Sequence, residues 1–230
     1  MPENTAPSKD IRTNGIVLRR TNYGEADRIL NILTPNGKIT AIAKGVRKTK
    51  SKLAGGIEMF SLIDFNIHLG RSEMGVVTSA KMLKYYGEII KDFTRMELAG
   101  TILKRANKAA ENSDNPEFFN IVEQCLAGLN RGTNTELAEG WFLLNLVKAT
   151  GEEVNLYRDT DGDKLAIKSK YNWDIASESF AKNERGEYGA DEIKMLRLMM
   201  TADLQTVQRV KIPAEMYSKL LNLSRIAAHI

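Results

Sequence analysis

The sequence is poor in the residues that most enzymes use for nucleophilic or metal chemistry. It contains one cysteine, Cys125, and two histidines, His68 and His229. A single cysteine excludes an internal disulfide and any multi-cysteine zinc site built from this chain alone. With so few cysteines and histidines, a Cys/His or Ser/His catalytic pair is not favoured. Because Cys125 is in helical register with Phe118 and Leu129, the pattern favours a buried structural thiol.

The sequence also lacks features typical of nucleotide hydrolysis or of a membrane protein. It has no G-x-x-x-x-G-K-[ST] motif, the loop that holds the phosphates of ATP. Its longest apolar runs, such as Trp141-Phe142-Leu143-Leu144, are far shorter than the roughly 20 residues that span a bilayer. The polar N-terminus has no apolar stretch of a secretory signal. We therefore expect residues 1–10 to be disordered and the protein to be cytoplasmic, with no membrane partner.

Three alternating aspartates superficially match a calcium loop. Asp159, Asp161 and Asp163 stand at the first, third and fifth positions of such a loop. Gly162, however, is fourth rather than sixth, and Lys170 occupies the twelfth position, where a bidentate Glu is required. The segment is therefore predicted to be a polar hairpin turn, and no metal ligand is assigned.

A second carboxylate pair, Glu25 and Asp27, precedes a basic segment of the chain. Two such groups could hold Mg²⁺ for phosphodiester hydrolysis, so a metal-dependent nuclease stays open as an alternative function. No further acidic cluster joins them in this half of the sequence. A structural ion pair with Arg28 is the favoured interpretation.

In place of catalytic groups, the sequence has a concentrated run of positive charge. Residues 44–52 carry five cations in nine positions, and no Asp or Glu occurs from Ile29 to Ile57, although the net charge of the chain is only +4. We call residues 44–52 the basic loop. Its glycine and those that follow it predict a flexible segment that is poorly suited to a core. A basic loop between two strands indicates a phosphate backbone as partner.

The first part of the chain has the period of short strands. Apolar residues alternate with polar ones, His68 among them, at Ile63, Phe65, Ile67 and Leu69. Pro35-Asn36-Gly37, between two apolar runs, is a strong hairpin signal. About five strands are expected over residues 11–84, which suits a five-stranded OB-fold barrel. Such barrels bind nucleic acid on a strand face and its bordering loops.

The second part, residues 85–230, has a helical period. Helices are predicted over residues 91–111, 116–129, 135–150, 190–201 and 213–228. Asn115 before Pro116 is a typical helix start, and Gly151 is a typical helix stop. We expect Asp161-Gly162 to turn a short hairpin that continues through residues 165–167 towards Trp173. The predicted fold class is α+β, with an N-terminal OB-fold barrel and an α-helical C-terminal domain that carries a short β-hairpin insertion.

Motifs in the first part resemble the RecO family of bacterial recombination mediators. The likeness covers residues 11–80, and the helical half matches only in its apolar pattern and in Ala149-Thr150-Gly151. The motifs follow one another in matching order and spacing: Gly15-Ile16-Val17-Leu18, Gly24-Glu25-Ala26-Asp27-Arg28, Leu33-Thr34-Pro35, Gly37-Lys38, Ala43-Lys44-Gly45-Val46-Arg47-Lys48 and Ser51-Lys52-Leu53-Ala54-Gly55.

The resemblance implies a non-enzymatic mediator of recombinational DNA repair that uses no cofactor. Such a protein binds single- and double-stranded DNA and anneals complementary strands. Together with RecR it helps RecA replace single-strand-binding protein, whose acidic tail it contacts. By matching motif, the resemblance assigns DNA contacts to Lys44, Arg47 and Lys48, with Lys38 and Lys52 on the same surface. Charge and predicted loop placement add four further candidates: Arg19, Arg20, Lys50 and Arg71.

One departure from the family concerns zinc. Many relatives carry a four-cysteine motif after the segment that corresponds to Gly151, and this chain has no cysteine there. Because these cysteines are missing, zinc is predicted to be absent. Residues 152–188 are expected to take the place of the motif.

Aromatic residues suited to base stacking are scarce in the barrel half. The candidates are Tyr23, Phe60 and Phe65, and Phe65 is expected in the core. This scarcity favours contacts with the nucleic-acid backbone over contacts with bases. Since backbone contacts do not distinguish ribose from deoxyribose, an RNA-binding OB-fold protein stays open as an alternative. A scaffold that binds proteins through its helical half stays open as well.

Overall fold

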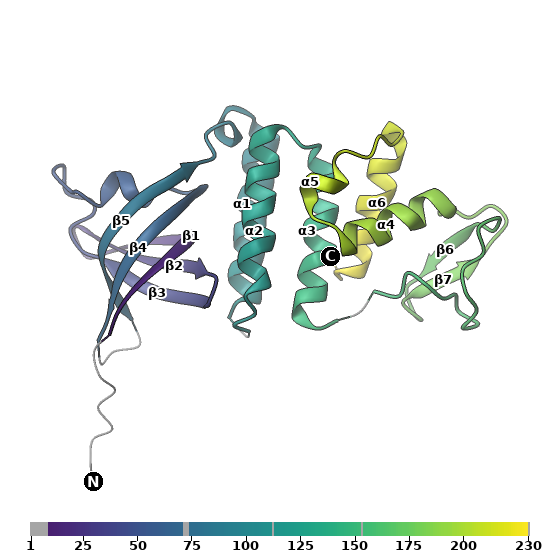
Figure 1. Cartoon of the computed structure of the whole chain (residues 1–230), viewed down its shortest axis with the longest axis horizontal. Coiled ribbons are helices and arrows are strands. Elements are labelled where there is room, and N and C mark those ends of the chain that lie inside the picture. The colour runs from purple at the N-terminus through teal and green to yellow at the C-terminus, as the bar shows by residue number, and fades with distance from the viewer. Residues whose placement is uncertain (1–8, 71–73, 112, 153, 230) are drawn as a thin grey trace, which may run out of the picture. The chain divides into compact units, whose positions relative to one another are not determined.

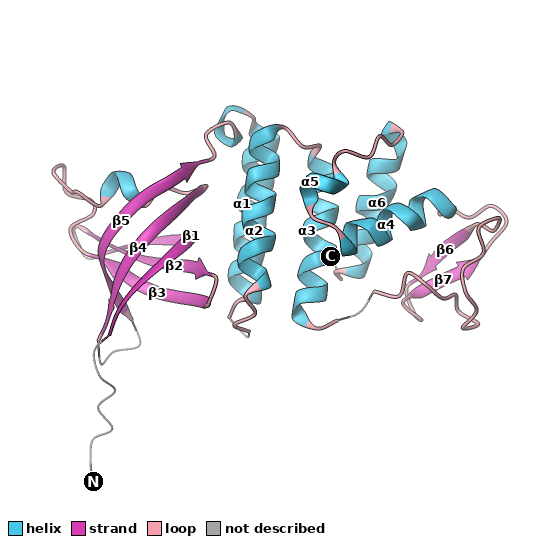
Figure 2. Ribbon diagram, viewed as in Figure 1, coloured by secondary structure: helices cyan, strands magenta, loops and turns pink. Residues whose placement is uncertain are grey.

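The chain folds into two compact units in a computed structural model. The structure describes residues 9–70, 74–111, 113–152 and 154–229. Residues 1–8 of the N-terminus that was predicted to be disordered lie outside these ranges, whereas Lys9 and Asp10 belong to the first strand, so the predicted boundary at residue 10 is wrong. Unit 1 comprises Met1–Leu126 and unit 2 comprises Ala127–Ile230. The division falls inside helix α2 (Glu117–Arg131). Figure 1 labels the elements, and Figure 2 shows most of the strands in the first part of the chain, and helices with one short hairpin in the rest.

Unit 1 contains a closed five-stranded barrel. Its strands are β1 (Lys9–Tyr23), β2 (Asp27–Thr34), β3 (Gly37–Ala43), β4 (Ser61–Leu69) and β5 (Gly75–Tyr85). They follow the order β1-β2-β3-β5-β4, and β4 pairs back with β1. All pairs are antiparallel except β3 with β5. This five-stranded closed barrel is an OB-fold, as the sequence predicts.

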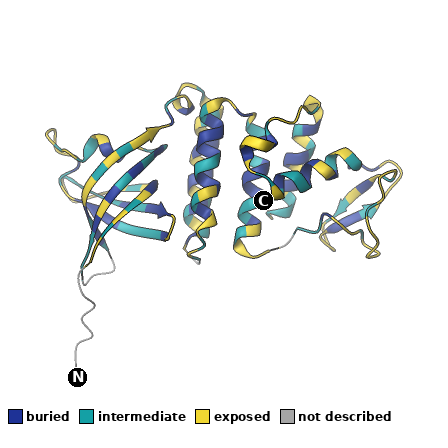
Figure 3. Ribbon diagram, viewed as in Figure 1, coloured by how far each residue is buried: buried dark blue, intermediate teal, exposed yellow. Residues whose placement is uncertain are grey.

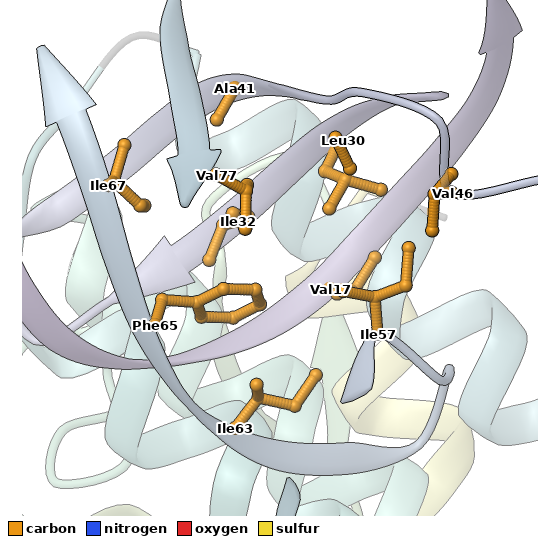
Figure 4. Close-up of a cluster of buried hydrophobic side chains, with 11 residues drawn as sticks. Val17, Leu30, Ile32, Ala41, Val46, Ile57, Ile63, Phe65, Ile67 and Val77 are labelled. Carbon is orange, nitrogen blue, oxygen red and sulfur yellow. The ribbon is translucent and has the colours of Figure 1, made fainter. Parts of the chain in front are cut away.

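The barrel core consists of aliphatic side chains around one phenylalanine. Phe65 is fully buried, and the alternation that predicts β4 places Ile63, Phe65 and Ile67 on the same inward face. Buried and exposed positions alternate along the strands in Figure 3. Figure 4 shows the buried side chains that converge inside the barrel: Val17, Leu30, Ile32, Ala41, Val46, Ile57, Ile63, Phe65, Ile67 and Val77.

The turn between β2 and β3 forms at Pro35 and Asn36, as predicted. The Thr34 hydroxyl donates to the Gly37 carbonyl oxygen at 2.8 Å and accepts from the Asn36 amide at 3.2 Å. These two hydrogen bonds fix the register in which β2 and β3 pair.

Helix α1 (Phe93–Ala109) and the first part of α2 complete unit 1. Helix α1 follows a short 3₁₀ turn, η2 (Ile89–Lys91), and its first turn is capped by Asp92, whose carboxylate accepts from the Arg95 amide at 3.0 Å. Asn107 of α1 accepts a hydrogen bond from Asn31 of β2 at 2.9 Å. This contact ties α1 to the outer face of the barrel.

Unit 2 contains the other helices, α3 (Thr135–Thr150), α4 (Ala190–Thr201), α5 (Leu204–Val207) and α6 (Ala214–Ala227). The bounds of α3 and α4 agree with the prediction, whereas the short α5 was not expected. Trp141 of α3 donates its indole N–H to the Ala202 carbonyl oxygen at 2.9 Å. The side chain of Met199 is buried, so this face of α4 packs in the core.

The short hairpin of unit 2 lies later in the chain than predicted. Its strands are β6 (Tyr171–Asp174) and β7 (Ser179–Lys182), and residues 165–167 belong to no strand. A turn does form at Asp161-Gly162, but beyond it only a single bridge, Arg158 to Lys164, joins the two sides. The position of the predicted hairpin is therefore wrong, because the aromatic residues that stabilise the strands come after it.

Phe180 of β7 is the centre of this hairpin. Its ring makes edge-to-face contacts with Tyr171, Trp173 and Tyr188, at centroid distances of 6.0, 5.1 and 5.8 Å. Such pairs contribute about 0.5–1.5 kcal/mol each beyond area burial. Burial raises the pKa of Tyr188 to about 12, so its phenol stays neutral in the cluster.

Two adjacent glycines, Gly55 and Gly56, lie in the 3₁₀ turn η1 (Ala54–Gly56), which follows the basic loop. They differ in how closely they approach the barrel. A Cβ on Gly56 would collide with the carbonyl oxygen of Ala80 in β5, whereas a Cβ on Gly55 meets nothing within 4 Å. We expect Gly56→Ala to lower the free energy of unfolding by about 1–3 kcal/mol, the usual cost of overpacking. Urea denaturation followed by far-UV circular dichroism measures it.

Gly55→Ala is the matched control, with little expected change in stability. Equal stability of the two variants would show that η1 does not rest against β5.

Candidate nucleic-acid interface

The basic loop leaves the barrel at the end of β3 and returns through η1. Consecutive tight turns form it: the Lys48 amide donates to the Gly45 carbonyl at 3.1 Å, and the Ser51 amide donates to the Lys48 carbonyl at 3.0 Å. Gly45 has a φ of +63°, in the left-handed region that glycine enters without strain. The loop therefore has a defined backbone path.

An apolar side chain inside the basic loop anchors it to the barrel. Val46 is 2% exposed and belongs to the same buried cluster as Leu30 and Ile57. Figure 4 shows Val46 turned inwards beside these residues. The prediction of a flexible loop without a place in the core is wrong in this respect. A single valine in an otherwise polar and charged segment is the sequence signal that could have identified the anchor.

Hydrogen bonds also fix the loop to residues 24–27, at the turn between β1 and β2. The Asp27 carboxylate accepts from the Gly45 amide at 2.7 Å. The Arg47 amide donates to the Ala26 carbonyl at 2.8 Å, and the Arg47 guanidinium donates to the Gly24 carbonyl at 3.3 Å. The loop and the β1–β2 turn thus form one surface.

The cations of the basic loop point into solvent. The amino groups of its four lysines make no ion pair or hydrogen bond with any residue that the structure describes, and all five cationic side chains are exposed: Lys44, Arg47, Lys48, Lys50 and Lys52. Because no carboxylate neutralises the lysines, the positive potential of this surface is available to an anion.

Arg19 and Arg20 occupy neighbouring positions of β1 and differ in their contacts. Arg20 forms an ion pair with Glu58 at 3.2 Å, which brings it close to the segment that follows η1. Arg19 is exposed and pairs along the ladder with Asn31, whose side chain faces α1. Of the two, Arg20 is the one next to the return of the loop, and its charge is partly neutralised.

The structure separates Lys38 from the basic loop. Lys38 lies at the start of β3, six residues before Lys44, which corresponds to about 20 Å along a strand. Its side chain is only 14% exposed, with the amino group 3.6 Å from a carboxylate oxygen of Glu111 and 3.5 Å from the Asn107 carbonyl. Lys38 and the basic loop therefore lie at opposite ends of β3 and not on one surface, which the short sequence separation did not reveal. A contact of Lys38 with DNA stays a prediction. Arg71 lies outside the described residues.

The acidic residues near the loop have a structural role that the sequence did not reveal. Arg28 donates to Asn22 at 3.2 Å, and Asp27 binds the Gly45 amide, so the predicted ion pair with Arg28 is wrong. The described residues hold no cluster of three or more His, Cys, Asp or Glu that could bind a metal ion. Asp27 therefore serves as an anchor for the backbone of the loop.

The remaining candidates for chemistry have structural partners. Asp159 accepts hydrogen bonds from the amides of Asp161 and Asp163, which confirms a polar turn. Burial raises the pKa of Cys125, so the thiol stays protonated. His68 lies 2.7 Å from the Asp10 carboxylate on the polar side of β4. In the described part of the chain, no helix is long and apolar enough to cross a membrane.

Comparisons with known proteins agree with this architecture. The family described as "Recombination protein O N terminal" matches residues 9–86, and "Recombination protein O C terminal" matches residues 91–226. The two matched ranges are separated by residues 87–90, whereas the compact units divide after Leu126. The expected domain boundary at residues 84–85 therefore stays a prediction.

Curated relatives are similar over most of the chain. A protein named DNA repair protein RecO from Dehalococcoides mccartyi strain 195 is 30% identical over 219 residues, which cover 92% of this chain and 86% of the relative. One of the same name from Alkaliphilus metalliredigens is 28% identical, covering 91% and 89% of the two chains. A third, from Bifidobacterium longum strain DJO10A, is 38% identical over 133 residues, with 56% and 55% covered.

The hydrogen bond between Asp27 and the Gly45 amide can be tested by comparing Asp27 with Glu25, the other acid near the turn between β1 and β2. We expect Asp27→Ala to increase hydrogen–deuterium exchange in the basic loop, because the Gly45 amide loses a charged acceptor worth about 1.5–3 kcal/mol. Glu25→Ala is the control, since the exposed Glu25 carboxylate makes no bond to a described residue. Unchanged exchange at Gly45 in Asp27→Ala would contradict the role of this carboxylate.

Proposed function

This chain belongs to the RecO family of DNA repair proteins, and from that premise we propose that it is a non-enzymatic, cytoplasmic mediator of recombinational repair. It binds single- and double-stranded DNA, anneals complementary strands and helps load a recombinase onto DNA coated with single-strand-binding protein. The observation that carries this proposal is the basic loop, with five exposed cations on an anchored backbone.

Neutralisation of phosphates supplies the binding energy. Each lysine or arginine that meets a phosphate releases condensed counterions, and this release makes binding favourable and dependent on salt. Lys44, Arg47 and Lys48 are the principal contacts in the proposal, with Lys50, Lys52 and Arg20 beside them. Backbone contacts of this kind carry no sequence information, which suits a protein that acts on any damaged DNA.

Annealing follows from the same electrostatics. Two complementary strands repel each other through their phosphates until cations lower that repulsion. A surface that holds one strand by its backbone leaves the base edges free to find their partners, so pairing needs no chemical step and no nucleotide. The proposal therefore requires neither a catalytic residue nor a cofactor.

Protein partners complete the proposal: RecR, RecA indirectly, and the acidic tail of single-strand-binding protein. Unit 2 has a groove of about 310 Å³ with chemistry suited to an acidic tail. Met195, Leu198 and Ile212 are among its apolar walls. Lys194 and Lys211 line it as well, together with Asp191, which lies 3.5 Å from the Lys194 amino group and partly neutralises it. Apolar walls accept the hydrophobic part of a peptide while the lysines attract its carboxylates.

The basic loop is tested by fluorescence anisotropy of a labelled single-stranded DNA at several salt concentrations. We expect the logarithm of the association constant to fall with the logarithm of salt by about 0.7 per neutralised phosphate. Arg47→Glu/Lys48→Glu is expected to weaken binding at least tenfold at low salt, since it replaces two attractive charges with repulsive ones.

Lys164→Glu/Lys168→Glu is the matched control, because it makes the same change in net charge at exposed lysines of unit 2. If the two double variants bound single-stranded DNA equally well, the basic loop would not be the DNA-binding site. The loss of affinity would then come only from the change in net charge.

The proposed tail groove is tested with a labelled peptide copy of the acidic tail. Lys194→Glu/Lys211→Glu should weaken peptide binding several-fold by repelling its carboxylates, and should leave single-stranded DNA binding unchanged. Peptide affinity that does not respond to these two substitutions would place the tail elsewhere.

A further inference from the structure

Tyr23 is an exposed aromatic side chain beside the basic loop. Of the three aromatic residues that the sequence offers for base stacking, Phe65 is fully buried in the barrel and Phe60 is half-buried, whereas Tyr23 is 54% exposed. Phe60 also has an unusual φ of +54°, and its carbonyl accepts from the Tyr86 amide at 3.0 Å. Only Tyr23 of these three presents a large aromatic surface to solvent.

The strand register places Tyr23 on the same side of the hairpin as the loop. Tyr23 is the last residue of β1 and pairs directly with Asp27 of β2. Side chains of directly opposed residues share one face of an antiparallel pair. The Asp27 carboxylate accepts from the Gly45 amide in the basic loop, so this face is the one that meets the loop. The adjacent pair, Asn22 with Arg28, occupies the opposite face and is joined by its own hydrogen bond of 3.2 Å.

A cationic group contacts the backbone of the turn that follows Tyr23. The Arg47 guanidinium donates to the carbonyl of Gly24, the residue that follows Tyr23, at 3.3 Å. One end of the barrel thus combines an exposed aromatic ring with a guanidinium and the lysines of the loop. Proteins that bind single-stranded nucleic acid use this combination, since the cations follow the backbone while bases stack on the rings.

From this geometry we infer that Tyr23 stacks on an unpaired base of a strand whose phosphates lie on the basic loop. The inference rests on the proposed function and adds a contact that only a single strand can make. The bases of a duplex already stack on one another and have no free face for the ring. Tyr23 therefore favours single strands over duplexes, whereas the lysines attract both.

The test removes the Tyr23 ring by substitution and, separately, the bases of the DNA by use of an abasic strand. Fluorescence anisotropy measures the affinity of the full chain and of Tyr23→Ala for an oligothymidylate and for an abasic strand with the same number of phosphates. The expected result is that Tyr23→Ala weakens oligothymidylate binding about tenfold, within the range known for one base–aromatic stack, and leaves abasic-strand and duplex binding unchanged. Tyr23→Trp should retain the affinity for oligothymidylate.

Tyr157→Ala is the control, because Tyr157 is a similarly exposed tyrosine, at 57%, in unit 2. Thermal melting verifies that each variant folds. An equal loss of affinity for oligothymidylate and the abasic strand would overturn the inference, because the ring would then act without a base. An unchanged affinity for oligothymidylate would overturn it as well, while salt-dependent binding by the unaltered chain would keep the proposed function. Failure of the unaltered chain to bind either strand would overturn both.

Discussion

The candidate interface depends on the attachment of the basic loop to the barrel. Five like charges close together repel one another, most strongly at low ionic strength. Burial of the Val46 side chain opposes this repulsion, and complete burial of a valine contributes about 1.5–3 kcal/mol. The hydrogen bond from the Gly45 amide to Asp27 adds a charged acceptor at the point where the loop begins. The cations are therefore held on a fixed backbone, so binding a phosphate need not first order the loop.

The sequence predicts the parts of the fold that depend on neighbouring residues. The alternation in β4 and the Pro35-Asn36-Gly37 turn are local signals, and both elements form where they were expected. The parallel pair of β3 and β5 brings together Ala41 and Gly75, which no local pattern connects. The hairpin of unit 2 was misplaced for the same reason, because its position depends on contacts of Phe180 with residues on both sides.

The interface could be predicted in its charge but not in its geometry. The run of lysines and the absence of acids from residues 29–57 are visible in the sequence, and the structure leaves those lysines exposed. Lys38 belongs to the same acid-free stretch of sequence, yet it lies at the other end of β3, where its amino group is close to Glu111. Asp27 looked like a catalytic or ion-pairing group, and only the folded chain shows that its partner is a backbone amide. Charge is a property of composition, whereas the pairing of a charge depends on strand length and register.

The closure of the barrel has a consequence for synthesis on the ribosome. β1 pairs with β4, and Arg12 of β1 bonds to Asp64 of β4, 52 positions later in the chain. The free side of β3 is covered only when β5 has emerged, and η1 also rests against β5 at Ala80. Contacts between distant positions form slowly because the intervening chain must first be ordered. A nascent chain that ends before β5 thus exposes an unpaired strand edge beside a cationic segment, a state open to chaperones and to the surrounding ribosomal RNA.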